Sequence, residues 1–177
     1  MLIAGDIYDS SVVNAEAISL YNEAMTTLCA GLGIPVIVIA GNHDSAPRLA
    51  ACRELLRASG LYVTGRLDGT LEPVLLDGGN VAVYSLPFFG KEEVCALFPE
   101  KKADIRSQET ATMAVCDHIR QQMDKNRFNI VLSHSLTVAA ELSESDRSAR
   151  VGFATAVSSH LSFRRNTKSW NNSFKDF

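Results

Sequence analysis

Two hydrophobic patterns alternate along the chain and predict a protein of alternating strands and helices. Short runs of branched apolar residues are typical of buried strands, whereas apolar residues that recur every three or four positions are typical of amphipathic helices. The two patterns predict strands at 2–4, 34–40, 61–64, 71–76, 81–86 and 128–132, and helices at 14–32, 45–59, 92–98 and 105–125. Strands that alternate with helices, plus one hairpin at Asp77-Gly78-Gly79-Asn80, indicate an α/β layered fold.

The predicted helices carry recognisable ends and apolar faces. Asn14 is the candidate N-cap of the first helix, and Ser45 is that of the second, which Gly60 would end. The apolar face of the first helix is expected to contain Ile18, Tyr21, Met25, Leu28 and Leu32. Core packing explains this face, and a contact between two copies of the chain is the alternative. The inner side of the last helix is expected to contain Ile105, Met113, Cys116, Ile119 and Met123.

Polar side chains follow three of the predicted strands, in a chain order that suggests a site. In open α/β sheets, ligands collect at the carboxyl ends of the strands. The stretches AGDIYD, AGNHD and LSH place at such ends Asp6, Asp9, Asn42, His43, Asp44 and His134. Each stretch has an ordinary alternative, which is a turn with a helix cap for the first two and a buried, hydrogen-bonded histidine for the third. Their occurrence at successive strand ends favours a shared site.

The residue types suit a centre of two divalent metal ions. A carboxylate such as Asp6 can bridge two ions, the amide oxygen of Asn42 is a neutral hard ligand, and the His134 imidazole can complete the shell. This mixture of oxygen and nitrogen ligands suits Mn²⁺ and, less selectively, iron or zinc. Two such ions activate a water molecule for attack on a phosphoester. His43 would then protonate the leaving oxygen or bind the phosphate.

Composition limits the classes of protein that the chain can represent. Its 177 residues suit a single domain, and 46% hydrophobic with 21% charged residues is ordinary for a globular protein. The net charge of −3 argues against a protein that holds nucleic acid by a broad basic surface. It leaves open an enzyme whose metal ions contact the phosphates, or one that gains DNA affinity from a partner.

The cysteines and the N-terminus bear on the compartment. The four cysteines lie far apart without a CxxC pair and are expected to be reduced residues of the core, with neither a disulfide framework nor a zinc site. The N-terminal sequence has no basic region of a secretory signal, and no apolar run has the length of a membrane span. These features predict a cytoplasmic protein that is not bound to a membrane.

The motifs resemble those of the calcineurin-like metallophosphoesterases. GDIYD, GNHDS, LPFF and SHSLTVAAELSESDRSARVG are similar to the motifs of the SbcD-like nuclease branch of this family, and the resemblance runs from residue 2 to residue 160. It implies a layered αββα sandwich in which two central sheets are flanked by helices. It also implies a DNA substrate, two Mn²⁺ ions in each site, an SbcC-type ATPase partner and a homodimer.

The same resemblance assigns roles to the candidate site residues. Asp6 corresponds to the bridging ligand, Asn42 and His134 to ligands of the second metal, and His43 to the catalytic histidine. The two remaining acids of the motifs are expected to support the catalytic histidine and its loop rather than to bind metal; they are Asp9 and Asp44.

Two motifs of the family are missing from the sequence. Family members carry a D-x-H motif on the first strand and a G-H-x-H motif beyond the position of His160, and neither occurs here. We therefore expect residues 1–163 to form a partial nuclease domain with an incomplete sandwich, one bound ion or none, and impaired catalysis. Residues 164–177 are expected to be a polar tail, either non-native or disordered. The alternatives are an inactive interaction module and a phosphoesterase of the same family that acts on small substrates.

Overall fold

Two β-sheets form the centre of the protein. The computed structural model describes residues 1–10, 12–67, 71–135 and 153–158. The first sheet is parallel and has the order β1 (Leu2–Ala4), β2 (Val36–Ile39), β3 (Leu61–Thr64). The second sheet is mixed, with the order β4 (Val74–Leu76), β5 (Val81–Leu86), β6 (Phe128–Ser135), β7 (Phe153–Ser158). Within it, β5 and β6 are parallel, and the other neighbours are antiparallel.

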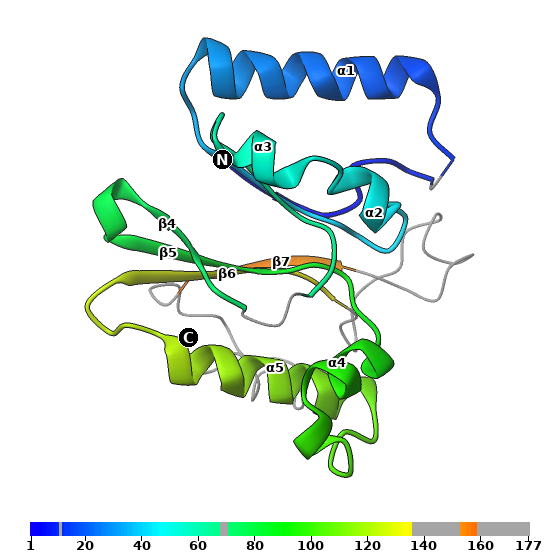
Figure 1. Ribbon diagram of the computed structural model, residues 1–177, viewed down its shortest axis with the longest axis vertical. Coiled ribbons are helices and arrows are strands. Elements are labelled where there is room, and N and C mark those ends of the chain that lie inside the picture. The colour runs from blue at the N-terminus through cyan, green and yellow to red at the C-terminus, as the bar shows by residue number, and fades with distance from the viewer. Residues whose placement is uncertain (11, 68–70, 136–152, 159–177) are drawn as a thin grey trace.

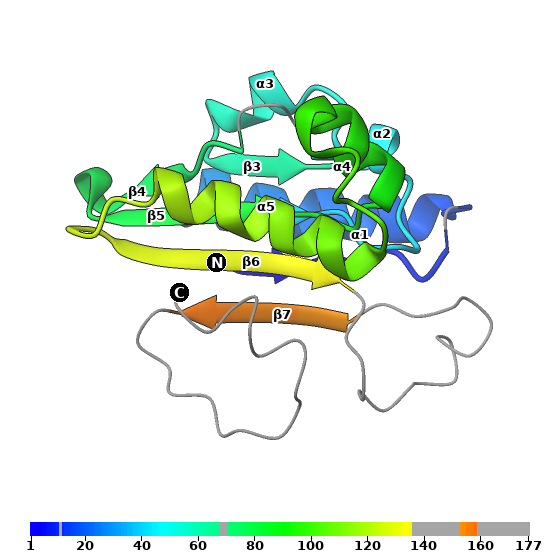
Figure 2. The same cartoon turned by 90° about the horizontal axis from the view of Figure 1, so that it is seen from below.

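Helices cover the outer face of each sheet (Figure 1). On the first sheet lie α1 (Ala15–Thr26), the π-helical turn η1 (Thr27–Gly31), α2 (Ala46–Leu49) and α3 (Arg53–Arg57). On the second sheet lie α4 (Lys91–Leu97) and α5 (Gln108–Gln122), and Figure 2 shows α5 extending along β5 and β6. Two short 3-10 helices complete the described chain, η2 (Asp77–Gly79) and η3 (Pro99–Lys101). The layers follow the order helix, sheet, sheet, helix, which confirms the α/β sandwich.

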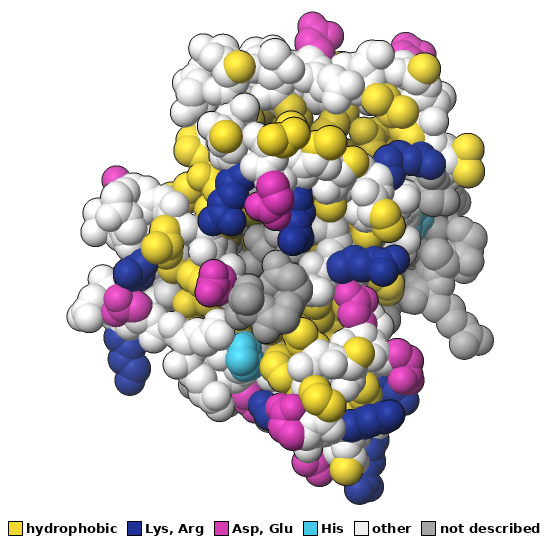
Figure 3. All heavy atoms as spheres, in the orientation of Figure 1, with side chains coloured by type: hydrophobic (Ala, Val, Ile, Leu, Met, Phe, Trp, Pro, Cys, Tyr) yellow, Lys and Arg dark blue, Asp and Glu magenta, His cyan; other side chains and the backbone are white. Residues whose placement is uncertain are grey.

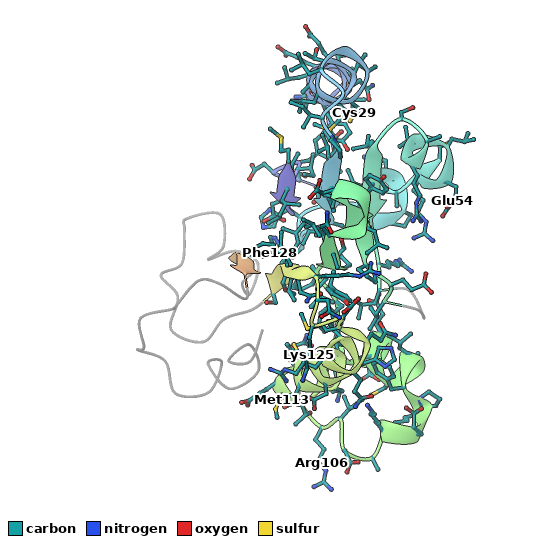
Figure 4. All side chains as sticks on the ribbon, turned by 90° about the vertical axis from the view of Figure 1, so that its left-hand side faces the viewer. Cys29, Glu54, Arg106, Met113, Lys125 and Phe128 are labelled. Atoms are coloured by element: carbon teal, nitrogen blue, oxygen red, sulfur yellow. The ribbon has the colours of Figure 1, made fainter. Side chains whose placement is uncertain are left out.

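Side-chain alternation along the central strands produces these layers. Val36 and Val38 of β2 face the helices of the first sheet, whereas Ile37 and Ile39 pack against Val83 and Leu132 of the second sheet. All four β2 side chains are fully buried, so this strand has no solvent face. A strand with two buried faces needs the continuous apolar run that its sequence shows. Figure 4 shows the layers edge-on, with Cys29 near α1 at one end and Met113 on α5 at the other.

Two of the predicted helices differ from expectation. The helix predicted at 45–59 is broken into α2 and α3, because Cys52 adopts a left-handed conformation with φ of 56°. Cys52 is exposed, so the prediction that all four cysteines belong to the core is wrong at this position, although all four are free thiols. In α5, Met113 is 42% exposed because the buried side follows the spacing Ala111, Val115, Ile119, which places Met113 on the opposite side.

The remaining predictions about the elements are confirmed in outline. Asn14 caps α1 by accepting a hydrogen bond from the Ala17 N–H at 2.8 Å. The expected hairpin is the antiparallel β4–β5 pair. The apolar face of α1 is narrower than expected, since Met25 is buried whereas Ile18 and Leu32 are exposed. The predicted tail at 164–177 lies outside the described residues.

Candidate metal centre

The candidate site lies where strands of both sheets end. Asp6 follows β1, and Asn42 follows the neighbouring parallel strand β2, so both come from the same edge of the first sheet. His134 belongs to β6 of the second sheet. Its neighbour two positions earlier, Leu132, packs between the sheets, and alternation turns the His134 side chain to the same side. His134 therefore reaches across to the first sheet.

Three predicted ligands converge on one point. Nε2 of His134 lies 2.9 Å from Oδ1 of Asn42 and 3.6 Å from Oδ2 of Asp6. The His134 side chain is 3% exposed, whereas that of Asp6 is 32% exposed. The site is thus closed by protein on the side of β6 and open to solvent on the side of Asp6. The structure brings these three residues together, as the sequence predicted.

The hydrogen bonding of His134 shows why a cation fits this point. Nδ1 lies 2.8 Å from the carbonyl oxygen of Ala4, which can only accept, so Nδ1 carries the proton. In the neutral ring Nε2 is then an acceptor, and it faces an amide oxygen and a carboxylate oxygen, which are also acceptors. A cation bound between these three atoms would take the place of the hydrogen that a direct contact between them requires. A metal-bound histidine characteristically donates its other N–H to such a carbonyl.

Two glycines allow the three ligands to approach one another. A Cβ atom on Gly5 would lie 2.7 Å from Cγ of His134, and one on Gly41 would lie 2.7 Å from Cγ of Asp6. Real Cβ contacts are essentially never this short. Gly5 also has φ of 87°, a conformation that favours glycine. Both positions therefore require glycine for the geometry of the site.

Asp44 ties the two loops of the first sheet together. Its Oδ2 accepts hydrogen bonds from the N–H groups of Ile7 at 3.1 Å and Gly41 at 2.8 Å, and its Oδ1 accepts one from Tyr8 at 3.0 Å. A carboxylate that accepts hydrogen bonds from three main-chain N–H groups fixes the loops that carry them relative to one another. These contacts join the loop after β1 to the loop after β2, and a role of Asp44 in supporting catalysis stays a prediction.

His43 is held by the loop that follows β1. Its main-chain N–H donates to Oδ1 of Asp6 at 3.1 Å, and its ring Nδ1 lies 2.9 Å from the carbonyl oxygen of Asp9. Since a carbonyl only accepts, Nδ1 donates the proton and Nε2 is the basic nitrogen of the neutral ring. The sequence predicts Asp9 as a supporting acid, and the contact that the structure shows is made by its main chain.

Two tyrosines connect this loop to α1. The rings of Tyr8 and Tyr21 lie 5.9 Å apart, and Tyr21 belongs to α1. Burial raises the pKa of Tyr21 to about 12, and the nearby Tyr8 and Asp44 add to the effect. Burial, followed by the Asp44 carboxylate, also raises the pKa of Tyr8. Helix α1 thereby supports the loop that carries Asp6.

Sequence reasoning missed two partners of the site. One is the Ala4 carbonyl that fixes His134, which belongs to the main chain and so is not indicated by any residue type in the sequence. Phe88 of the LPFF stretch stands at the site, with its ring edge-on to that of His134 at a centroid distance of 6.3 Å and an angle of 79°. Its N–H donates to the carbonyl of Ala40 at 2.8 Å, which joins the end of β5 to the end of β2. The break of the strand at Pro87 was the available signal.

Three further observations concern only the described part of the chain. No three side chains of His, Cys, Asp and Glu form a metal-binding group there; the candidate set contains two of these, Asp6 and His134, together with the amide of Asn42. No helix within it is long and apolar enough to cross a membrane. The whole stretch ELSESDRSARVG, which resembles SbcD-like nucleases, lies outside it.

Comparison with known proteins identifies the family. The profile of the calcineurin-like phosphoesterases matches residues 1–161. The D subunit of nuclease SbcCD from Staphylococcus epidermidis is 33% identical over 164 residues, which cover 93% of this chain and 42% of the relative. Its counterpart from Staphylococcus saprophyticus is 32% identical over 161 residues, which cover 91% of this chain and 42% of the relative. The chain thus spans less than half the length of these curated relatives, and it belongs to the calcineurin-like phosphoesterase family.

Proposed function

We propose that the chain is the metal-binding part of an SbcD-like nuclease that hydrolyses DNA phosphodiesters with a divalent metal ion, Mn²⁺ in the first instance. The convergence of Asp6, Asn42 and His134 on one point carries the proposal. The similarity to proteins named as nucleases supports DNA as the substrate. Those relatives are named as one of the subunits of SbcCD, which supports an SbcC-type ATPase partner.

Each residue of the site has a task in this reaction. Asp6, Asn42 and His134 would hold the ion, which would supply Lewis-acid polarisation of the phosphate and activation of a water molecule. The Ala4 carbonyl fixes the proton of His134 on Nδ1, so that Nε2 is available to the ion. His43, held through Nδ1 by the Asp9 carbonyl, would take up a proton from solvent on Nε2 and pass it to the leaving oxygen. Asp44 keeps the loops that carry these groups in register.

The ligand set limits the activity to be expected. Among the described residues, Asp6, Asn42 and His134 would supply three ligands to one ion, and a second ion would have only the Asp6 carboxylate to share. We therefore propose that the described site binds one Mn²⁺ weakly and that hydrolysis is slow. Homodimer formation and a cytoplasmic location stay predictions.

The first experiment is hydrolysis of end-labelled DNA by the purified chain with and without Mn²⁺. Asn42→Ala should remove both hydrolysis and Mn²⁺ binding, whereas His43→Ala should lower hydrolysis about 100-fold and leave Mn²⁺ binding intact. His118→Ala is the matched control, because His118 lies on α5 and bonds to Gln122. Mn²⁺-dependent hydrolysis that survives both site substitutions would refute the proposed site.

A phosphoesterase that acts on small substrates is the second candidate. The acidic composition favours it, and on the face shown in Figure 3 the Lys and Arg side chains are interspersed with Asp and Glu rather than joined into a basic surface. Hydrolysis of bis-(p-nitrophenyl) phosphate without cleavage of DNA would favour this candidate. Mn²⁺ binding without hydrolysis of either substrate would indicate that the chain is an inactive interaction module.

A further inference from the structure

Phe88 is an aromatic side chain whose position the core does not explain. Its neighbour Phe89 is 3% exposed and packs in the hydrophobic cluster between the second sheet and the helices α4 and α5. Phe88 points elsewhere, is half-buried, and belongs to none of the three hydrophobic clusters found among the described residues. Its ring thus lies outside the packed core and beside the polar groups of the candidate metal centre.

The main chain fixes this ring at the candidate metal centre. The Phe88 N–H donates to the Ala40 carbonyl, directly before the glycine that precedes Asn42. The ring meets that of His134 at 79°. In an edge-on pair only one of the two rings offers a face to the other, so at least one face of Phe88 is not covered by His134. The ring is thus positioned at the candidate metal centre and is only partly buried.

We propose that Phe88 is a specificity-determining residue that stacks on a nucleobase flanking the phosphodiester, an inference that rests on the proposed function. A phosphate held at Asp6, Asn42 and His134 has its own nucleoside within reach of a ring next to His134. Aromatic rings stack on any base, because every base has a π face. Stacking also requires no positive charge, which suits a chain with a net charge of −3.

The test compares binding of two short single strands to the full chain in Mn²⁺, measured by fluorescence anisotropy. One strand is oligothymidylate, and the other has the same backbone with abasic residues. Phe88→Leu should raise the Kd for oligothymidylate about fivefold or more and leave the Kd for the abasic strand unchanged. Phe88→Tyr, which keeps the ring, should restore binding. Phe128→Leu is the control, since Phe128 is 36% exposed at the opposite end of β6.

The outcomes separate this inference from the proposed hydrolysis. Equal affinity of the unaltered protein for both strands, or an equal loss for both strands in Phe88→Leu, would overturn the stacking role. A structural role for Phe88 would instead lower Mn²⁺ affinity together with binding of both strands. If the unaltered protein prefers oligothymidylate through Phe88 but cleaves nothing, the stacking role stands and the hydrolytic function fails. If it cleaves DNA but Phe88→Leu changes the binding of neither strand, the hydrolytic function stands and the stacking role fails.

Discussion

Gly41→Ala tests the geometry of the candidate metal centre without relying on activity. The added methyl carbon would lie 2.7 Å from Cγ of Asp6, whereas ordinary contact begins at 3.4 Å. Asp6 must therefore move by about 0.7 Å at Cγ, the difference between these two distances, and by more at Oδ1, which lies closer to the methyl. That movement lengthens the 3.1 Å hydrogen bond from the His43 N–H and shifts Oδ2 relative to His134.

The expected effect follows from the size of this shift. A displacement of about 1 Å in a positioned group is enough to lose two orders of magnitude in rate, and we expect Mn²⁺ affinity to fall at least about tenfold. Overpacking should also reduce the free energy of unfolding by about 1–3 kcal/mol. Titration of free Mn²⁺ by electron paramagnetic resonance measures the affinity, and urea unfolding measures the stability.

Gly31→Ala is the matched control for this substitution. A Cβ at Gly31 would lie 3.9 Å from its nearest neighbour, the Thr26 carbonyl oxygen, so the methyl fits. Because Gly31 is in a helical turn, alanine there should leave Mn²⁺ binding unchanged and stabilise the fold by about 0.5–1 kcal/mol. A folded Gly41→Ala protein with the Mn²⁺ affinity of the unaltered chain would refute the assignment of Asp6 as a ligand.

Three other predictions concern stability, each measured by urea unfolding. Asp44→Ala leaves three main-chain N–H groups without their acceptor and should lower the unfolding free energy by about 3 kcal/mol. Asp117→Ala is the control, because it removes only a surface ion pair with Arg120 and should change the unfolding free energy by less than about 0.5 kcal/mol. Because the pKa of Tyr21 is raised in the fold, its neutral hydroxyl contributes stability that is fully present below pH 10 and is lost as the pH rises towards 12. Tyr21→Phe should therefore lose less unfolding free energy over that range. A loss identical to that of the unaltered protein would contradict the assignment. Mn²⁺ at about 100 times its Kd should raise the unfolding free energy by about 2.7 kcal/mol and should have no effect on His134→Ala; equal stabilisation of both would place the ion elsewhere.

The sequence alone determined the layered fold and the predicted ligands of the candidate site. Continuous and periodic apolar patterns predict whether each position is buried. The unbroken apolar run Val36–Ile39 predicts that both faces of β2 are buried, as the structure shows. Parallel neighbours end at the same edge of a sheet, so polar residues after β1 and β2 had to meet. That rule is enough to bring Asp6 and Asn42 together from the order of the residues.

Tertiary structure decided which groups touch, because such contacts join residues far apart in the chain. The proton on Nδ1 of His134 is fixed by the Ala4 carbonyl, 130 positions away, and a main-chain acceptor leaves no trace in the sequence. The contact of the Asp9 carbonyl with His43 and that of the Phe88 ring with His134 also join residues that are distant in the chain. The break at Cys52 and the exposure of Met113 were likewise set by how each helix packs on its sheet. A pattern of residues shows that a position is covered, and only packing shows what covers it.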